Sequence, residues 1–251
     1  MRDVHPPRRR RARAPWHNRC HFATRRAGSA PRRWRSRPGR VNVPPMAPTE
    51  RHLLLVRHGE TDWNAAGRWQ GQTDVPLNAT GRAQAAALAA RLRPEGVRAI
   101  ATSDLCRARG TAEIVGEALG LRIAFVDADL RERAYGLWEG LTRGECEARF
   151  PEEWARHVSD PRAPPPAGES TDALLARVLP AIERAAGRLE SPAVLVTHGG
   201  VMRAFLAAAL GACPGPAQVA PPRFIPNGGV WRVRLVAGRV VGAAALHGDA
   251  P

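Results

Sequence analysis

Apolar runs of strand length alternate along most of the chain with segments whose apolar residues recur at helical spacing. Unbroken runs of this kind are typical of strands that are buried on both faces of a parallel sheet. They cover residues 52–57, 97–102, 121–126 and 193–197. Helical spacing covers 81–92, 105–119, a segment from 170 or 171 to about 187, and 200–210, with one or two short helices expected within 141–167. Alternation at 230–236 and 240–246 predicts a closing hairpin that turns at Ala237-Gly238.

Strands that alternate with helices predict an α/β fold with three layers, in which a mostly parallel central sheet has helices on both faces. Local signals place some helix ends. Thr80 is expected to cap the helix over 81–92, with Ala83, Leu88 and Leu92 turned inward. Gly120 is expected to end the helix over 105–119. The chain of 251 residues is long enough for one such domain with a sizeable core.

Positive charge is concentrated in the first 45 residues. The chain carries a formal charge of +15 and has no lysine, but residues 1–45 hold 14 arginines and one acid, whereas residues 46–251 are nearly neutral. We predict that 1–45 is a disordered extension rich in arginine and proline, and that 46–251 is the folded domain. Three interpretations of the extension stay open: a misassigned start upstream of Met46, an arm that binds nucleic acid or another polyanion, and a transit peptide.

The remaining composition favours a cytoplasmic protein. The extension has no apolar stretch with the length of a secretory signal core, and no apolar stretch of the chain reaches the roughly 18 residues of a membrane span. The four cysteines show no CxxC spacing, so the sequence predicts reduced thiols rather than a disulfide framework. Nothing in the sequence decides between a monomer and a homodimer.

Two histidines stand at predicted strand ends, each followed by glycine. Arg57-His58-Gly59 ends the first apolar run, and His198-Gly199-Gly200 ends the run at 193–197. If these strands are parallel neighbours, both side chains open into one crevice at the carboxyl edge of the sheet. The helix that begins near Gly200 would point its amino end toward that crevice, which favours an anion there.

Two further strand ends supply charged groups. Arg107 lies in the first turn of a predicted helix, where a cation is unfavourable unless it faces a bound anion. The segment 130–140, which contains Glu132 and Glu139, follows the third predicted strand, and a carboxylate there could serve as a general acid. The spacing of His58, Glu60 and Asp62 is also compatible with a metal site, which His198 could join, but the adjacent arginine would repel a cation, so no metal is predicted.

Five motifs of this sequence resemble, in order and spacing, those of the histidine phosphatase superfamily, also called the phosphoglycerate-mutase-like family. The resemblance spans about residues 50–246. The motifs are Arg57-His58-Gly59-Glu60-Thr61-x-x-Asn64, Gly71-x-x-Asp74-x-Pro76-Leu77-x-x-x-Gly81, Ser103-Asp104-Leu105-x-Arg107-Ala108, Glu132-x-x-x-Gly136-x-x-Glu139-Gly140 and His198-Gly199-Gly200.

The resemblance implies a role for each site residue. His58 would attack phosphorus and form a phosphohistidine, provided that its attacking nitrogen is neutral and its other nitrogen donates to a backbone carbonyl. Arg57 and Arg107 would bind the phosphoryl oxygens with planar guanidinium groups. His198 would contact the phosphoryl group opposite His58, and Asn64 would add a neutral donor.

The same resemblance assigns the proton-transfer and substrate residues. Glu132 would protonate the leaving oxygen and then activate the water that breaks the phosphohistidine. Gly199 would bind phosphate at the start of its helix, and Tyr135 would lie near the substrate. Trp63, Trp69 and Trp138 could cover a ring at the mouth of the site.

We predict a phosphatase that acts on a small phosphomonoester and needs no cofactor. Mutases and phosphatases share this core, so proteins with it are often named phosphoglycerate mutases. Here the segment 141–167 is short, and its arginines Arg143, Arg149, Arg156 and Arg162 are isolated, whereas glycolytic mutases carry an adjacent arginine pair. The alternatives are a phosphoglycerate mutase primed by 2,3-bisphosphoglycerate and a polyanion-binding module that acts through the basic extension.

Overall fold

The computed structural model describes residues 50–211 and 222–246. Contacts divide the chain into Met1–Pro45 and Met46–Pro251, and every described residue belongs to the second unit. The predicted disorder of residues 1–45 therefore lies outside the described residues.

Six strands form one sheet in the order β3-β2-β4-β1-β5-β6. The first four strands of that order are parallel, while β5 runs antiparallel to β1 and forms a hairpin with β6. The predicted mostly parallel sheet is confirmed, and so is the closing hairpin. The strands are β1 (Glu50–Arg57), β2 (Ala99–Thr102), β3 (Ile123–Val126), β4 (Ala193–Thr197), β5 (Val230–Val236) and β6 (Arg239–Ala245).

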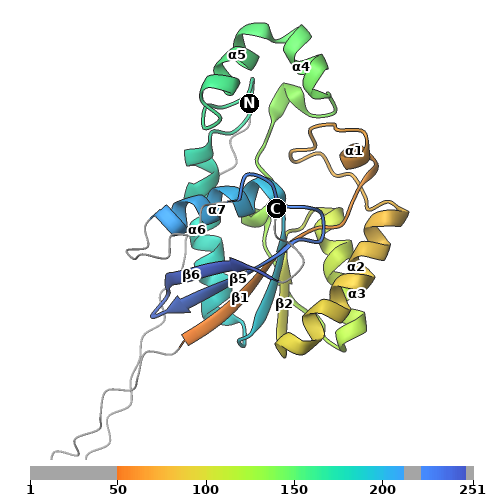
Figure 1. The fold of residues 1–251 in the computed structure, drawn as a ribbon, viewed down its shortest axis with the longest axis vertical. Helices are drawn as coiled ribbons and strands as arrows, with labels where there is room; N and C mark the ends of the chain where they lie inside the picture. Colours follow the sequence, from red (N-terminus) through yellow and green to blue (C-terminus); the bar gives the residue numbers. More distant parts are fainter. Residues whose placement is uncertain (1–49, 212–221, 247–251) are drawn as a thin grey trace, which may run out of the picture. The chain divides into compact units, whose positions relative to one another are not determined.

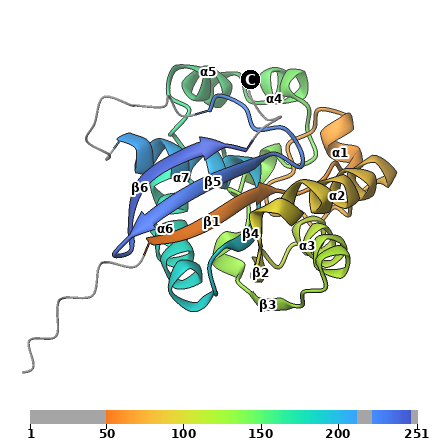
Figure 2. The same cartoon turned by 60° about the horizontal axis from the view of Figure 1, so that its bottom comes forward.

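Helices cover both faces of this sheet, with α2 and α3 on one side and α6 and α7 on the other (Figures 1 and 2). The α-helices are α1 (Asp62–Ala65), α2 (Ala79–Leu92), α3 (Cys106–Leu119), α4 (Arg143–Arg149), α5 (Pro151–Ser159), α6 (Thr171–Arg188) and α7 (Gly199–Gly211). Short 3-10 turns are η1 (Arg93–Glu95), η2 (Ala128–Leu130) and η3 (Gly136–Trp138).

The first apolar run of the sequence supplies both cores, because successive side chains of a strand point to opposite faces. Leu53 and Leu55 pack with the apolar residues of α6 and α7. Leu54 and Val56 pack with those of α2 and α3. All four side chains are buried, so β1 lies in the middle layer of a three-layer domain. The predicted fold class is confirmed.

The amino end of α2 differs from the prediction. Asn78, not Thr80, is the N-cap, and its side chain accepts a hydrogen bond of 2.8 Å from the backbone N–H of Gly81. Leu88 and Leu92 are buried as predicted, but Ala83 is exposed. Asn78 and Thr80 are both suitable capping residues, and the contact of Gly81 with Glu60 determines where the helix begins. The backbone of Gly81 packs so closely on Glu60 that a Cβ at position 81 would lie 2.0 Å from the Glu60 carbonyl oxygen.

A separate cluster of aromatic side chains joins η3 to α4 and α5, which lie at the top of the view in Figure 1. The two short helices confirm the prediction for 141–167. Trp138 is fully buried between Trp69 and Trp154, with ring centroids 6.0 and 5.5 Å away. His157 packs edge-on against Trp138 at 5.0 Å. This cluster attaches α4 and α5 to the loops that surround the site.

Candidate active site

The carboxyl ends of β1 and β4 bring the two predicted histidines together. These strands are parallel neighbours with Arg57 paired to Thr197, so the next residue of each strand emerges at the same edge of the sheet. The imidazole rings of His58 and His198 have centroids 5.2 Å apart and an interplanar angle of 61°. The expectation that the two strand ends meet is confirmed.

The surroundings of His58 keep its imidazole neutral, with a free lone pair on Nε2. Its Nδ1 lies 2.6 Å from the carbonyl oxygen of Gly59, which can only accept, so Nδ1 carries the proton and Nε2 keeps the lone pair. The side chain is 97% removed from solvent, leaving 3% exposed. Burial, followed by the charges of Arg107 and Arg57, lowers the pKa of His58 well below its ordinary value.

Two guanidinium groups flank this histidine, one half-buried and the other fully buried. Arg57, the last residue of β1, donates from Nη1 to the Ile225 carbonyl oxygen at 2.6 Å. Arg107, in the first turn of α3, is fully buried and donates to the carbonyl oxygens of Thr73 and Gly71 at 2.8 and 2.7 Å. Carbonyl oxygens hold both groups in place without neutralising them, so both positive charges remain available to an anion.

Two nearby carboxylates have different roles. Glu132 accepts from the backbone N–H groups of Gly200, Val201 and Arg133, at 2.9, 3.1 and 2.9 Å. The amino end of α7 thus holds the carboxylate of the protein itself, where the sequence predicted an external anion. Gly200 is needed for this approach, because a Cβ there would lie 2.3 Å from Glu132 Oε1.

Glu139 instead fastens a loop. Its carboxylate accepts from the backbone N–H groups of Gln72, Thr73 and Tyr135 at 3.0 Å each, and from the Thr73 hydroxyl at 2.6 Å. These bonds hold the loop whose carbonyl oxygens position Arg107. Glu139 does not line the cavity above His58, whereas Glu132 does.

That cavity has a volume of about 300 Å³ and contains most of the predicted site residues. His198 does not line this cavity. Its side chain is fully buried next to His58, with Nε2 3.0 Å from Ser103 Oγ. Trp69 reaches the cavity, whereas Trp63 and Trp138 do not. The predicted residues that line it are Arg57, His58, Asn64, Arg107, Glu132, Tyr135 and Gly199.

The sequence analysis missed several lining residues. Gln70 is buried in the loop after α1 and lines the cavity. Arg203 interrupts the apolar sequence of α7, and a lone charge on an apolar helix was the signal that could have found it. Phe224 lines the mouth and is 70% exposed, with its ring centroid 5.8 Å from the Arg57 guanidinium carbon. Nothing in the local pattern around Phe224 indicated its place.

Asn64 is positioned by a cap. Its Oδ1 accepts from the backbone N–H of Thr61 at 3.2 Å and from Asn227 Nδ2 at 3.2 Å, in a capping box with Thr61. The amide nitrogen of Asn64 remains as the donor, which suits the neutral role predicted for it. Within residues 50–211 and 222–246, no three His, Cys, Asp or Glu side chains are grouped to hold a metal ion. Among the helices of that same part, none is long and apolar enough to cross a membrane.

We expect the stability of the domain to fall as the pH drops below about 6.5. The pKa of His58, His198 and His157 is lowered from the ordinary value of 6.5, in each case mainly by burial. Below that value the unfolded chain binds protons more readily than the folded chain, so the free energy of unfolding decreases by up to about 1.4 kcal/mol per pH unit for each of the two buried histidines, His58 and His198. The contribution of His157 is smaller, because its side chain is only partly buried and solvent screens its charge. Urea titrations at pH 7.5, 6.5 and 5.5 measure this, and the His58→Ala protein should show a shallower slope. A flat profile would contradict the expectation.

A family profile matches residues 53–240, and its description is the histidine phosphatase superfamily (branch 1). The chain belongs to the histidine phosphatase superfamily. The match includes both strand-end histidines and the segments that carry Arg107 and Glu132. The resemblance expected from the five motifs is therefore confirmed.

Relatives in this superfamily carry both phosphatase and mutase names. A glucosyl-3-phosphoglycerate phosphatase of Mycolicibacterium vanbaalenii is 39% identical over 170 residues, covering 64% of this chain and 75% of the relative. The metal-independent phosphoserine phosphatase of Arabidopsis thaliana is 41% identical, covering 61% and 66%. A "Probable phosphoglycerate mutase GpmB" of Photorhabdus laumondii is 41% identical, covering 59% and 69%.

Among solved structures, the mycobacterial glucosyl-3-phosphoglycerate phosphatase in complex with VO3 has a TM-score of 0.65 and 35% identity. The match covers 73% of this chain and 92% of that one. The chain is therefore a histidine phosphatase superfamily enzyme, and the predicted hydrolysis of phosphomonoesters agrees with these relatives.

Proposed function

We propose that this histidine phosphatase hydrolyses the phosphomonoester of a small metabolite through a phosphohistidine at His58. The observation that carries the proposal is a buried neutral imidazole between the charged Arg57 and Arg107, in a cavity where Glu132 is the one carboxylate among the described lining residues. In this proposal residues 46–251 are the catalytic domain. The reaction takes place in the cytoplasm, which agrees with the free thiols of Cys106 and Cys146.

The first half of the proposed reaction transfers the phosphoryl group to the protein. His58 Nε2 attacks phosphorus while the ester P–O bond breaks, and Glu132 gives its proton to the leaving oxygen. Arg57 and Arg107 stabilise the charge on the three non-bridging oxygens, with Asn64 as a neutral donor. His198 supports this geometry through the contact between its ring and the ring of His58.

The second half releases phosphate. Glu132, now ionised, takes a proton from a water molecule, the resulting hydroxide adds to phosphorus, and the P–N bond to His58 breaks. The three backbone N–H groups around the Glu132 carboxylate hold it in one orientation for both proton transfers.

The arginines of the segments 132–136 and 141–167 favour hydrolysis over a mutase reaction. Arg133, which belongs to the mutase-like segment Glu132-Arg133-Ala134-Tyr135-Gly136, is buried and donates to the carbonyl oxygens of Glu169, Pro161, Arg162 and Ala163. It therefore serves the fold. The isolated arginines of the segment 141–167 do not line the cavity either.

The substrate names of two relatives suggest where to look first. One name contains phosphoglycerate and the other phosphoserine, and both compounds carry a carboxylate beside the phosphoryl group. The cavity of about 300 Å³ suits a metabolite of that size.

The test is phosphate release from a panel of phosphomonoesters, with and without EDTA. The panel contains 3-phosphoglycerate, phosphoserine, glycerol 3-phosphate and a hexose phosphate. We expect turnover that EDTA leaves unchanged, because the proposed charge stabilisation comes from two arginines. No phosphate release, together with interconversion of 3- and 2-phosphoglycerate, would replace the phosphatase proposal with the mutase.

A further inference from the structure

The backbone around Glu132 is held by an arginine from the middle of α6. Nη1 of Arg177 donates to the carbonyl oxygens of Asp129 and Arg131, at 2.8 and 2.7 Å. Nη2 of the same side chain donates to the carbonyl oxygen of Glu132 at 2.9 Å. Arg177 is not among the described residues that line the cavity above His58. It therefore contacts the backbone of the proposed acid without reaching the substrate.

Glu169 fixes the orientation of this guanidinium group. Its carboxylate oxygens accept from Nε and Nη2 of Arg177, each at 2.8 Å. Together with the three carbonyl oxygens, these contacts engage all five N–H groups of the guanidinium. The backbone N–H of Glu169 also donates to the carbonyl oxygen of Ala134 at 2.9 Å. The ion pair is thus joined to the loop on both sides of Glu132, and its side chains are only 19% and 14% exposed.

The Glu132 carboxylate makes its own contacts on the opposite side, with α7. It accepts from the backbone N–H groups of Gly200 and Val201 at 2.9 and 3.1 Å. These N–H groups lie in the first turn of the helix, where no intrahelical carbonyl oxygen is available to them. One side chain therefore spans the distance between the loop and α7. A shift of the loop by about 1 Å would break these hydrogen bonds and move the carboxylate away from the leaving oxygen.

A second arginine of α6 contacts the same loop in a different way. Arg184 lies about two turns farther along the helix. Its Nη2 pairs with the carboxylates of Asp127 and Asp129, at 2.8 and 2.7 Å. Arg184 thus fastens side chains at the start of the loop, whereas Arg177 fastens the backbone of Glu132 itself. The two arginines allow the effect of a loosened loop to be separated from the effect of a displaced acid.

We propose that Arg177, held by Glu169, is a positioning residue that keeps the Glu132 carboxylate in place for proton transfer to the leaving oxygen. The inference rests on the proposed function, because Arg177 acts through the acid of that mechanism. Loss of Arg177 lowers the rate for esters whose leaving oxygen needs a proton and spares esters whose leaving oxygen does not. The planar fork of the guanidinium reaches several acceptors at once, so a lysine cannot replace it.

The test is the ratio of kcat for glycerol 3-phosphate to kcat for 4-nitrophenyl phosphate, whose leaving oxygen needs no proton. In Arg177→Gln this ratio should fall about 10- to 100-fold. Arg177→Lys should lower it as well, and this variant carries the test if Arg177→Gln does not fold. In a Glu132→Gln background, the added change Arg177→Gln should leave the ratio unaltered, because the acid through which Arg177 acts is already lost.

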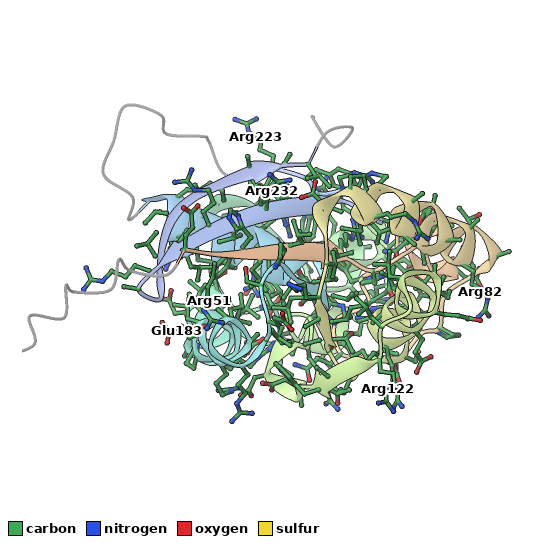
Figure 3. The ribbon with its side chains drawn as sticks, turned by 90° about the horizontal axis from the view of Figure 1, so that it is seen from below. Arg51, Arg82, Arg122, Glu183, Arg223 and Arg232 are labelled. Atoms are coloured by element: carbon green, nitrogen blue, oxygen red, sulfur yellow. The ribbon has the colours of Figure 1, made fainter. Side chains whose placement is uncertain are left out.

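Two other arginine variants are the controls. Arg184→Gln breaks the ion pairs at the start of the loop, so it should lower the melting temperature and keep the ratio of the wild type. Arg122→Gln changes a side chain that points away from the ribbon in Figure 3 and does not line the cavity, so it should alter neither quantity. An unchanged ratio in the Arg177 variants would overturn the inference. So would an equal fall in Arg184→Gln, or the ratio of the wild type in Arg177→Lys.

Hydrogen exchange separates this inference from a failure of the proposed function. The backbone N–H groups of Gly200 and Val201 are bonded to the Glu132 carboxylate, so their exchange rates, measured by NMR, report its position without any substrate. Arg177→Gln should raise both rates about 10-fold, and Arg184→Gln should not. If the wild type releases no phosphate, the proposed function fails. Faster exchange in Arg177→Gln alone would then still support the positioning role, and unaltered exchange would refute it.

Discussion

Replacing His58 by alanine should lower phosphate release by at least about 10³-fold. The proposed mechanism passes through a covalent bond to Nε2, and the other cavity residues offer no comparable neutral nitrogen. The measurement is kcat/KM for the best ester of the panel. Arg122→Gln serves as the matched control and should behave like the wild type.

Two further observations make this result specific for the covalent step. The wild type, mixed with substrate and quenched in alkali, should carry one phosphoryl group on the peptide that contains His58, as detected by mass spectrometry. Added imidazole should restore part of the activity of His58→Ala, because the variant leaves a space of matching shape. Activity above one tenth of the wild type in His58→Ala, in a folded protein, would refute the nucleophile assignment.

Glu132→Gln should lower kcat by about 10² to 10⁴ for esters with poor leaving groups. Glutamine has nearly the same shape but cannot transfer a proton to the leaving oxygen. The loss should be much smaller for 4-nitrophenyl phosphate, whose leaving oxygen needs no proton. The ratio of kcat for glycerol 3-phosphate to kcat for 4-nitrophenyl phosphate measures the effect.

The matched control for this variant is Glu139→Gln. Both carboxylates accept from several backbone N–H groups, so both changes turn an acceptor into a donor and cost about 1–3 kcal/mol of stability. Only Glu132 lines the cavity. Glu139→Gln should therefore lower the melting temperature without changing the ratio of the two esters. If both variants change the ratio alike, Glu132 acts through the fold and is not the acid.

The secondary structure was predictable where burial and a local signal agree. The strand Ala193–Thr197 was predicted with its observed bounds, because five consecutive buried positions leave no ambiguity about the element. Gly120 ends α3 with a φ of 71°, a conformation that glycine adopts without strain. The α2 cap was wrong, because Asn78 and Thr80 are both good capping residues and the close packing of Gly81 on Glu60 chose between them.

The chemistry of the two strand-end histidines was also predictable from the sequence. His58 and His198 each follow a buried strand, and parallel strands present their carboxyl ends at one edge of the sheet. The need for an Nδ1 donor to a backbone carbonyl follows from imidazole chemistry alone, and Gly59 supplies that carbonyl. The local sequence is enough to place these two histidines, because each one directly follows a buried strand that ends at the site.

Only the tertiary structure decided which of the remaining polar residues act there. Glu132 and Glu139 lie seven positions apart after the same strand, and the local pattern does not tell the cavity carboxylate from the one that fastens a loop; before the structure, only the family resemblance singled out Glu132. Arg203, Gln70 and Phe224 come from α7 and two loops, and their convergence depends on how those segments pack over the sheet edge. Local patterns record burial and backbone conformation, whereas the direction of a side chain into a shared cavity is set by contacts between residues far apart in the chain.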